Sequence, residues 1–252
     1  MTSTLSSADL HASGLVRLLT SLMGQAAPSP PLALTERLGR LLDMNGSLKL
    51  SQIHARLSRL SFESDPALAR SLEKTYMATR ATMEQSIHDS FREGERTGFQ
   101  FRLPELAPEA PMDRCPAYDP YLRFYQAHQR EFSFRLQALQ ADTRQAAAGV
   151  SLKLTQVAVL DRVLGEFMQS LTQRSLSQIP KLLGLRFKHL FDTLSQSADC
   201  DSDLSHARWL AADGWLTQFH NEMKSTLLLE LDLRMQPILG LIEAINEHTQ
   251  SL

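Results

Sequence analysis

Nine apolar residues near the C-terminus recur at an interval that an α-helix satisfies and a β-strand does not. Their eight intervals average about 3.6 residues, which is the repeat of a straight α-helix. The shorter window from Leu229 to Met235 alternates apolar and polar residues as a strand does. The helical repeat extends over a longer window, so it decides the assignment. The stripe therefore predicts one long helix, and its members are Leu216, Phe219, Met223, Leu227, Leu231, Met235, Ile238, Ile242 and Ile245.

Several residues within this predicted helix lie off the stripe. Leu228, Leu229 and Leu233 occupy another side, so the helix is expected to contact neighbours on two sides or to offer these leucines to a partner. Pro237 has no N–H to donate to the carbonyl of Leu233, which predicts a bend.

Two charged residues of the same helix are spaced for pairing. Glu230 and Arg234 are four residues apart, which favours a helix-surface ion pair that contributes about 0.3 kcal/mol.

The rest of the chain also favours helix, because glycine is scarce and runs of Val, Ile and Thr are few. Ser64-Asp65-Pro66 and Tyr118-Asp119-Pro120 each place a capping side chain before a proline, as at helix starts. Pro180 must kink or break the helix that follows Gly149. We therefore predict an all-α fold, an elongated multi-helix bundle of about six helical regions with kinks at Pro180 and Pro237.

Three further apolar stripes support this fold and predict core residues. The first comprises Leu68, Leu72, Tyr76, Met83, Ile87 and Phe91, and the second Tyr121, Tyr125, His128, Phe132, Leu136 and Leu139. The third runs through Leu154, Val157, Leu160, Leu164, Phe167 and Leu171 and resumes after the break at Ile179, Leu183, Phe187, Leu190 and Leu194. Helices are also expected at Ala8 to Met23, from Thr35 to Asn45, over Leu48 to Leu60 and from about Leu204 onward.

A proline-rich segment from 93 to 118 divides the chain. Its four prolines forbid a continuous helix and predict an internal loop between an N-terminal helical region, 1–92, and a C-terminal long-helix bundle, 119–252. The two regions are either separate or one continuous domain. Phe99, Phe101 and Leu103 alternate within the loop, so it either folds back over the bundle, the favoured reading, or docks a partner.

Charge is distributed unevenly although the net charge is only −2. The stretch from Phe167 to Phe191 holds Arg174, Lys181, Arg186 and Lys188 and no acid, whereas residues 192–252 hold ten acids. Arg174, Lys181 and Lys188 are spaced seven apart, so before the break at Pro180 is considered they share one helix face. That face is solvated, meets the acidic C-terminal region, or contacts nucleic-acid phosphates; the first two readings are favoured.

Motifs for catalysis or for ligand binding are absent from the sequence. There is no phosphate-binding glycine loop, no dinucleotide fingerprint, no nucleophile elbow, no HExxH and no pair of ExxH motifs. We expect no cofactor, no metal and no enzymatic activity.

Isolated residues that resemble site residues have plainer interpretations. His128 is expected to be a buried, hydrogen-bonded core residue. The groups His220-Asn221-Glu222 and Glu247-His248 are expected to face solvent. Cys115 is expected to be incidental, and an exposed thiol with a lowered pKa is the alternative.

The composition of the chain restricts the cellular compartment in which the protein is expected. Two distant cysteines give no disulfide framework, the N-terminus lacks the charged and apolar regions of a signal peptide, and no run approaches about 20 apolar residues. We expect a cytoplasmic protein that does not insert into a membrane.

Three stretches, read together, resemble a bacterial family catalogued as domain of unknown function 3348. They are GLVRLLTSL with TERLGRLLDMNGSLKLS, then IPKLLGLRFKHL, and finally WLTQFHNEMKSTLLLELDLRMQPILGLIEAI. The last is the most specific, because it matches an LLxELDLRLQP core followed by a short apolar tail. At Gly184-Leu185 this chain departs from the charged pair that is commoner in the family.

This resemblance implies a genomic context and no catalytic residue. Members resemble companions of a stator-like proton channel of the inner membrane, as in type III Zorya phage defence. The expected function is therefore a non-enzymatic cytosolic adaptor or effector of an ion-driven motor complex, peripheral to the inner membrane through its partners. The partner would be the channel protein or another accessory protein, a homo-oligomer is a further option, and a nucleic-acid-binding effector is the alternative.

Overall fold

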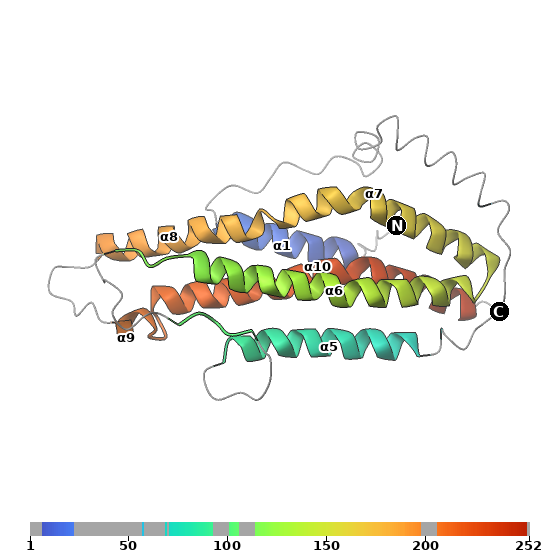
Figure 1. Cartoon of the computed structure of the whole chain (residues 1–252), viewed down its shortest axis with the longest axis horizontal. Helices are drawn as coiled ribbons and strands as arrows, with labels where there is room; N and C mark the ends of the chain where they lie inside the picture. Colours follow the sequence, from blue (N-terminus) through green and yellow to red (C-terminus); the bar gives the residue numbers. More distant parts are fainter. Residues whose placement is uncertain are drawn as a thin grey trace, which may run out of the picture. The chain divides into compact units, whose positions relative to one another are not determined.

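The computed structural model describes residues 7–22, 57, 69, 71–92, 101–105, 114–197 and 206–250. Every regular element in these ranges is an α-helix, which confirms the all-α prediction (Figure 1). In chain order the elements are α1 (Ser7–Leu22), α5 (Leu72–Ser90), α6 (Asp119–Ala148), α7 (Leu152–Leu176), α8 (Ile179–Ser197), α9 (His206–Trp209) and α10 (Trp215–Gln250).

Most predicted helix boundaries agree with the structure. α1 starts within one residue of Ala8, α6 starts at Asp119, and α6 ends immediately before Gly149. The helices expected from Thr35 and over Leu48 to Leu60, and the helix start at Ser64-Asp65-Pro66, lie outside the described residues.

The last helical region differs from its prediction, because a turn at 210–214 divides it into α9 and α10. Gly214 closes this turn: its N–H donates to the carbonyl of Ala211 (2.8 Å), and its own carbonyl accepts from Gln218 (3.0 Å) in the first turn of α10. A Cβ at Gly214 would collide with the carbonyl oxygens of Arg208 and Trp209. Only glycine fits this position without a backbone shift.

The chain divides into two compact units, and α5, α6, α7 and α10 contribute residues to both, α7 only its last residue to the first. The first unit comprises Met1–Ala26, Arg80–Phe134 and Leu176–Arg234, and the second comprises Ala27–Thr79, Arg135–Ser175 and Met235–Leu252. The division into 1–92, 93–118 and 119–252 that the prolines suggest stays a prediction.

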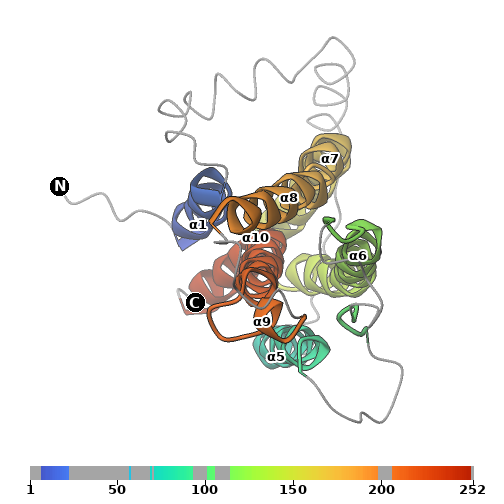
Figure 2. The same cartoon turned by 90° about the vertical axis from the view of Figure 1, so that its left-hand side faces the viewer.

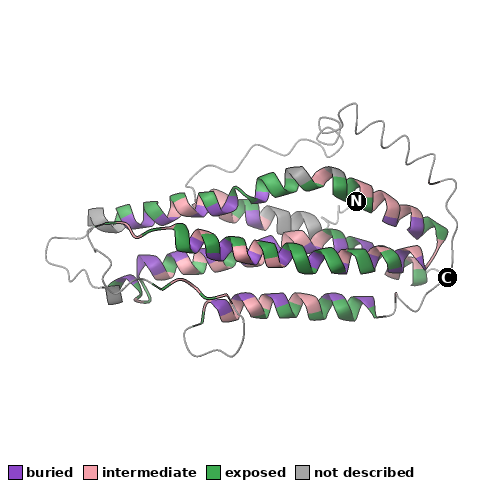
Figure 3. Ribbon diagram, viewed as in Figure 1, coloured by how far each residue is buried: buried purple, intermediate pink, exposed green. Residues whose placement is uncertain are grey.

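α10 contributes a long, continuous buried stripe to the core. All nine residues of its predicted stripe are at most 3% exposed, so the helical reading of this segment is confirmed. Figure 3 displays such buried positions as stripes along the helices. At about 0.8 kcal/mol per buried CH₂, these side chains supply a large share of the hydrophobic stabilisation.

In the first unit, α10 lies among α1, α5, α6 and α8 (Figures 1 and 2). Leu229 of α10 lies against Gly14 of α1, where the glycine leaves room for the leucine side chain. Asp232 of α10 pairs with Arg80 of α5 at 2.7 Å. The off-stripe leucine therefore contacts a second neighbour, as predicted.

An aromatic cluster forms the core between α6, α8 and α10 in the first unit. The ring of Phe187 lies 4.9 Å from that of Phe219, 5.1 Å from Trp215 and 5.4 Å from Tyr121. Most of these rings meet edge to face, a geometry that contributes about 0.5–1.5 kcal/mol per pair beyond burial. The predicted stripe of α8 is buried at its described members, Ile179, Leu183, Phe187 and Leu190.

The second unit is packed with smaller side chains. Ala146 and Ala147 of α6 and Ala158 of α7 are buried, which lets these helices approach closely. An ion pair between Arg144 of α6 and Asp161 of α7, 2.7 Å long, fixes their register at the surface.

The stripe predicted for α7 is only partly correct. Leu154 is buried, but Leu164 is 40% exposed, and the side chains of Phe167 and Leu171 lie outside those described. Helical periodicity predicts which residues share a face and does not establish how much of that face a neighbour covers.

The two prolines that were predicted to disturb helices behave differently. α7 ends at Leu176 and α8 begins at Ile179, so the break before Pro180 is confirmed. Pro180 is the second residue of α8, where its missing N–H is not needed. α10, in contrast, continues through Pro237, and the bend expected there stays a prediction.

Candidate functional site

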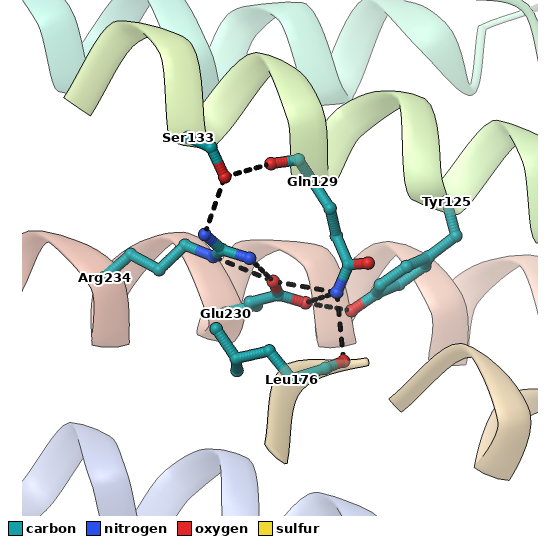
Figure 4. A network of polar contacts seen from close by, with 6 residues as sticks. All are labelled: Tyr125, Gln129, Ser133, Leu176, Glu230 and Arg234. Atoms are coloured by element: carbon teal, nitrogen blue, oxygen red, sulfur yellow. Dashed lines mark hydrogen bonds and ion pairs between the residues drawn. The ribbon is translucent and has the colours of Figure 1, made fainter. Parts of the chain in front are cut away.

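A buried carboxylate lies at the centre of a polar network in the first unit (Figure 4). Glu230 of α10 is fully buried and accepts hydrogen bonds from the hydroxyl of Tyr125 (2.8 Å) and the amide Nε2 of Gln129 (3.0 Å), both on α6. Arg234, one turn along α10, pairs with it at 2.7 Å. The carboxylate therefore has charge-assisted hydrogen bonds from two helices.

The network reaches beyond these two helices. Gln129 also donates to the carbonyl of Leu176 (3.1 Å), the last residue of α7, whose carbonyl has no helical partner of its own. Arg234 reaches Ser133 of α6 at 3.2 Å, and Ser133 donates to the carbonyl of Gln129 at 2.9 Å. The network thus holds the chain at the end of α7, α6 and α10 in one register.

The surface ion pair predicted for Glu230 and Arg234 is therefore wrong in its location. The two residues do pair, but Glu230 lies in the core because α6 covers that side of α10. Burial and the nearby Glu230 charge together raise the pKa of the Tyr125 phenol well above 10, so Tyr125 stays a donor. Tyr125 and Gln129, four residues apart on α6, were the signal in the sequence, since an aromatic hydroxyl and an amide on one face suit a buried carboxylate.

A second carboxylate of α10 corrects another prediction. Arg186 of α8 donates two hydrogen bonds to Glu222, of 2.9 and 2.8 Å, and these bonds raise the pKa of Arg186. Glu222 was expected to face solvent, and instead it joins α10 to α8. Arg186 is not one of the three residues of the predicted basic face, so this ion pair does not test that prediction.

His220 was also expected to face solvent, and that expectation is wrong. Its ring is half-buried beside Tyr121, with Nε2 3.4 Å from the tyrosine hydroxyl. Burial lowers the pKa of His220 to about 4, so the ring is neutral at pH 7. Asn221, next to it, is exposed as expected, whereas at the C-terminal end Glu247 is exposed and His248 half-buried.

His128 is the buried core residue that the sequence predicts. It is 1% exposed, and its Nε2 lies 3.1 Å from the hydroxyl of Ser90. Burial lowers the pKa of His128 to about 4. Its ring is neutral and packs against Phe124 and Phe101.

Residues 101–105, one of the two described parts of the proline-rich segment, fold back on the first unit. Phe101 packs its ring edge against His128 with centroids 4.8 Å apart, and the N–H of Leu103 donates to the carbonyl of Ser90 at 3.1 Å. Both side chains are half-buried, while Phe99 lies outside the described residues. Phe101 and Leu103 therefore have intramolecular partners, which supports the favoured reading of this loop.

The three off-stripe leucines of α10 are half-buried as well. Leu229 packs against α1, as described above, so it is engaged within the first unit. The exposed surface that Leu228 and Leu233 offer to a partner is correspondingly small. Their docking role stays a prediction.

The three basic residues proposed for a nucleic-acid face are all exposed but do not lie on one helix. Arg174 is in the last turn of α7, while Lys181 and Lys188 are on α8 beyond the break. The predicted alignment therefore holds only for the two lysines. Leu185, which lies between them on the same face, is 59% exposed.

Cys115 does not have the properties of a reactive thiol. It is half-buried, and burial raises its pKa, as does the charge of Asp192, while Lys188 acts in the opposite direction. The alternative of a thiol with a lowered pKa is not supported.

Two further searches of the described residues gave no site. No group of three or more His, Cys, Asp or Glu side chains there is arranged to hold a metal ion. None of the helices described here is both long enough and apolar enough to span a bilayer.

Comparison with known proteins yields one result. A family model described as a protein of unknown function, DUF3348, matches residues 1–247. No curated protein and no solved structure matches the chain. Because the match extends over nearly the whole sequence, including the buried α10 signature and its Glu230 network, the chain belongs to the DUF3348 family.

Proposed function

We propose that this protein is a non-enzymatic adaptor or effector that attaches to an ion-driven inner-membrane motor complex from the cytoplasmic side. The partner is the stator-like channel protein or another accessory protein of the same gene set, and the biological setting is phage defence of the Zorya type III kind. The resemblance of the sequence supplies this context. One structural observation supports a protein-binding role.

That observation is the outward stripe of α8. Leu185 is 59% exposed and is flanked on the same face by Lys181 and Lys188, both exposed. Phe134, Val16 and Leu210 of the same unit are exposed as well, but only Leu185 lies between two exposed lysines on one helix face. An exposed leucine framed by cations offers a partner both apolar area and charge, which is the composition of a helix-docking surface.

Co-purification with the motor channel protein in mild detergent tests the proposal. We expect the wild-type chain to be retained by the tagged channel protein and Leu185→Glu to be retained at least about tenfold less, a change of about 1.4 kcal/mol. Met77→Glu on α5 is the matched control, because Met77 has the same exposure, 59%. Absence of retention of the wild-type chain would count against the adaptor function.

The second candidate is a nucleic-acid-binding effector that uses Lys181 and Lys188. Their exposure supports it, and it predicts an affinity that falls steeply between low and moderate salt. One observation favours the protein partner: a phosphate backbone offers no apolar contact to the exposed side chain of Leu185, whereas an apolar side chain of a protein partner would cover it. An electrophoretic shift assay over a salt series separates the two candidates.

A further inference from the structure

The inner side of α8 shows how this helix recognises another helix. Phe187 packs against Phe219 of α10 with ring centroids 4.9 Å apart. Adjacent to it, Arg186 holds the carboxylate of Glu222 through two hydrogen bonds of 2.8 and 2.9 Å. α10 therefore contributes an apolar side chain, Phe219, and an acid three residues later. The neighbouring Phe187 and Arg186 of α8 contact them.

The outer side of α8 also carries an apolar side chain and cations, and these side chains are exposed. Lys181, Leu185 and Lys188 occupy positions i, i+4 and i+7, so they lie in one row with the leucine between the lysines. Neither lysine makes an ion pair within the described residues, whereas Arg80, Arg186 and Arg234 of the same unit each pair with a carboxylate of α10.

We propose that this outer face of α8 binds an acidic amphipathic helix of the partner protein. Two carboxylates seven positions apart on that helix pair with Lys181 and Lys188, and an apolar side chain between them covers Leu185. The inference rests on the proposed adaptor function and specifies the chemistry of its partner.

The spacing of the three side chains explains why a helix is the fitting occupant. The two lysines are separated along α8 by about 10 Å, two helical turns, and a second helix laid along α8 repeats its own side chains at that same interval. An extended peptide places its same-face side chains about 6.6 or 13 Å apart, and neither spacing matches the interval between the lysines. A phosphate backbone would pair with the lysines but leave Leu185 in water.

A designed peptide tests the proposal on the full-length protein. The probe is a fluorescent helical peptide of about four turns with leucine at its centre and glutamates flanking it at i and i+7, on an otherwise neutral Ala and Gln background. Anisotropy titration at low salt should give saturable binding to the wild-type chain. Lys181→Glu combined with Lys188→Glu should weaken that binding at least about tenfold.

Reversing the charges on both the peptide and the protein gives the decisive comparison of affinities. A second peptide with lysines in place of the two glutamates should bind the doubly reversed protein at least about tenfold more tightly than it binds the wild type. Leu185→Ser should weaken both matched pairs, because it removes the shared apolar contact. Arg123→Glu with Arg130→Glu, two exposed cations seven apart on α6, is the matched control and should change binding less than about twofold.

The following outcomes overturn either the inference or the proposed function on which it rests. Failure of the wild-type chain to bind the acidic peptide overturns it, as does equal loss in the α6 control, which would indicate a general charge effect. Binding of a random-sequence oligonucleotide that is lost in the α8 double variant, with no peptide binding, would assign the face to nucleic acid. If the channel protein co-purifies with the chain but the peptide does not bind, the proposed function stands and the inferred acidic helix is wrong. If the peptide binds but the channel protein does not co-purify, the binding face stands and the motor complex is not the partner.

Discussion

The two compact units solve the same packing problem with different chemistry. In the first unit, α10 contacts its neighbours through a cluster of aromatic rings and through three carboxylates. Glu222 and Asp232 pair with arginines of α8 and α5, and Glu230, which pairs with an arginine of α10 itself, accepts hydrogen bonds from α6. In the second unit, the same helix contributes aliphatic side chains such as Ile238 and Ile242, and α6 and α7 are packed through small residues.

This difference concerns specificity more than strength. An aliphatic stripe tolerates rotation or sliding of a helix with a modest loss, whereas a buried carboxylate must keep each of its donors. The first unit is thus expected to hold one register and to respond sharply to loss of a single polar group. The second should respond to changes of volume.

The largest effect is expected from Arg234→Met in the first unit. It leaves the buried Glu230 without its cation, and loss of one partner of a buried pair costs about 3–5 kcal/mol. The measurement is the free energy of unfolding in urea. Arg144→Met, which breaks the partly exposed pair with Asp161 in the second unit, should cost about 1 kcal/mol or less. Equal losses for both variants would remove the distinction between the units.

A somewhat smaller effect is expected from adding one methyl group to the chain between α9 and α10. Gly214→Ala places a Cβ against the backbone carbonyls of Arg208 and Trp209. The backbone must shift to remove this clash, which should lower the free energy of unfolding by about 3 kcal/mol. Gly165→Ala in the second unit meets only the movable end of Arg144, 3.1 Å away, and should be nearly neutral. Thermal melting of both variants checks this, and a neutral Gly214→Ala would show that the turn is not rigid.

Acid should destabilise the first unit by about 2 kcal/mol for each of two buried histidines. Burial lowers the pKa of His128 and of His220 to about 4, against about 6.5 in the unfolded chain, so the unfolded state binds more protons between these values. Stability is therefore full above about pH 6.5 and falls as the pH drops toward 4, with the stated loss reached near pH 5.

Amide hydrogen exchange at pH 7 and pH 5, corrected for intrinsic rates, measures where this loss occurs. Protection should fall around Ser90, Tyr121 and His128 before it falls in the second unit. The double variant His128→Gln, His220→Gln should lose less stability between the two pH values than the wild type. A uniform loss of protection in both units would contradict the assignment to these histidines.

Periodicity in the sequence predicted the described helices and most of their buried faces, with α7, where Leu164 is 40% exposed, as the exception. The stripe of α10 was correct at all nine positions because a 3.6-residue repeat depends only on backbone geometry. The break before Pro180 was predictable for the same local reason, the missing N–H.

Pairing across helices was not predictable in the same way. Nothing next to Glu230 or Glu222 in sequence distinguishes a buried carboxylate from an exposed one, because their partners Tyr125 and Arg186 are 105 and 36 residues away. The same limit explains His220, whose burial depends on Tyr121 of another helix. The exposed Leu185 was missed because a leucine on a helix is ordinarily assigned to the core.

The smallest effect is expected where the second unit leaves space, at Gly240 on the exposed side of α10. A Cβ at Gly240 would meet nothing within 4 Å, so Gly240→Ala exchanges a flexible residue for the best helix former and should raise the free energy of unfolding by about 1 kcal/mol. Urea titration against the wild type measures the gain. A lower free energy of unfolding would mean that the backbone needs the conformational freedom of glycine at this position, one turn after Pro237. The half of α10 with aliphatic contacts would then depart from regular helix geometry more than the half whose carboxylates pair with arginines.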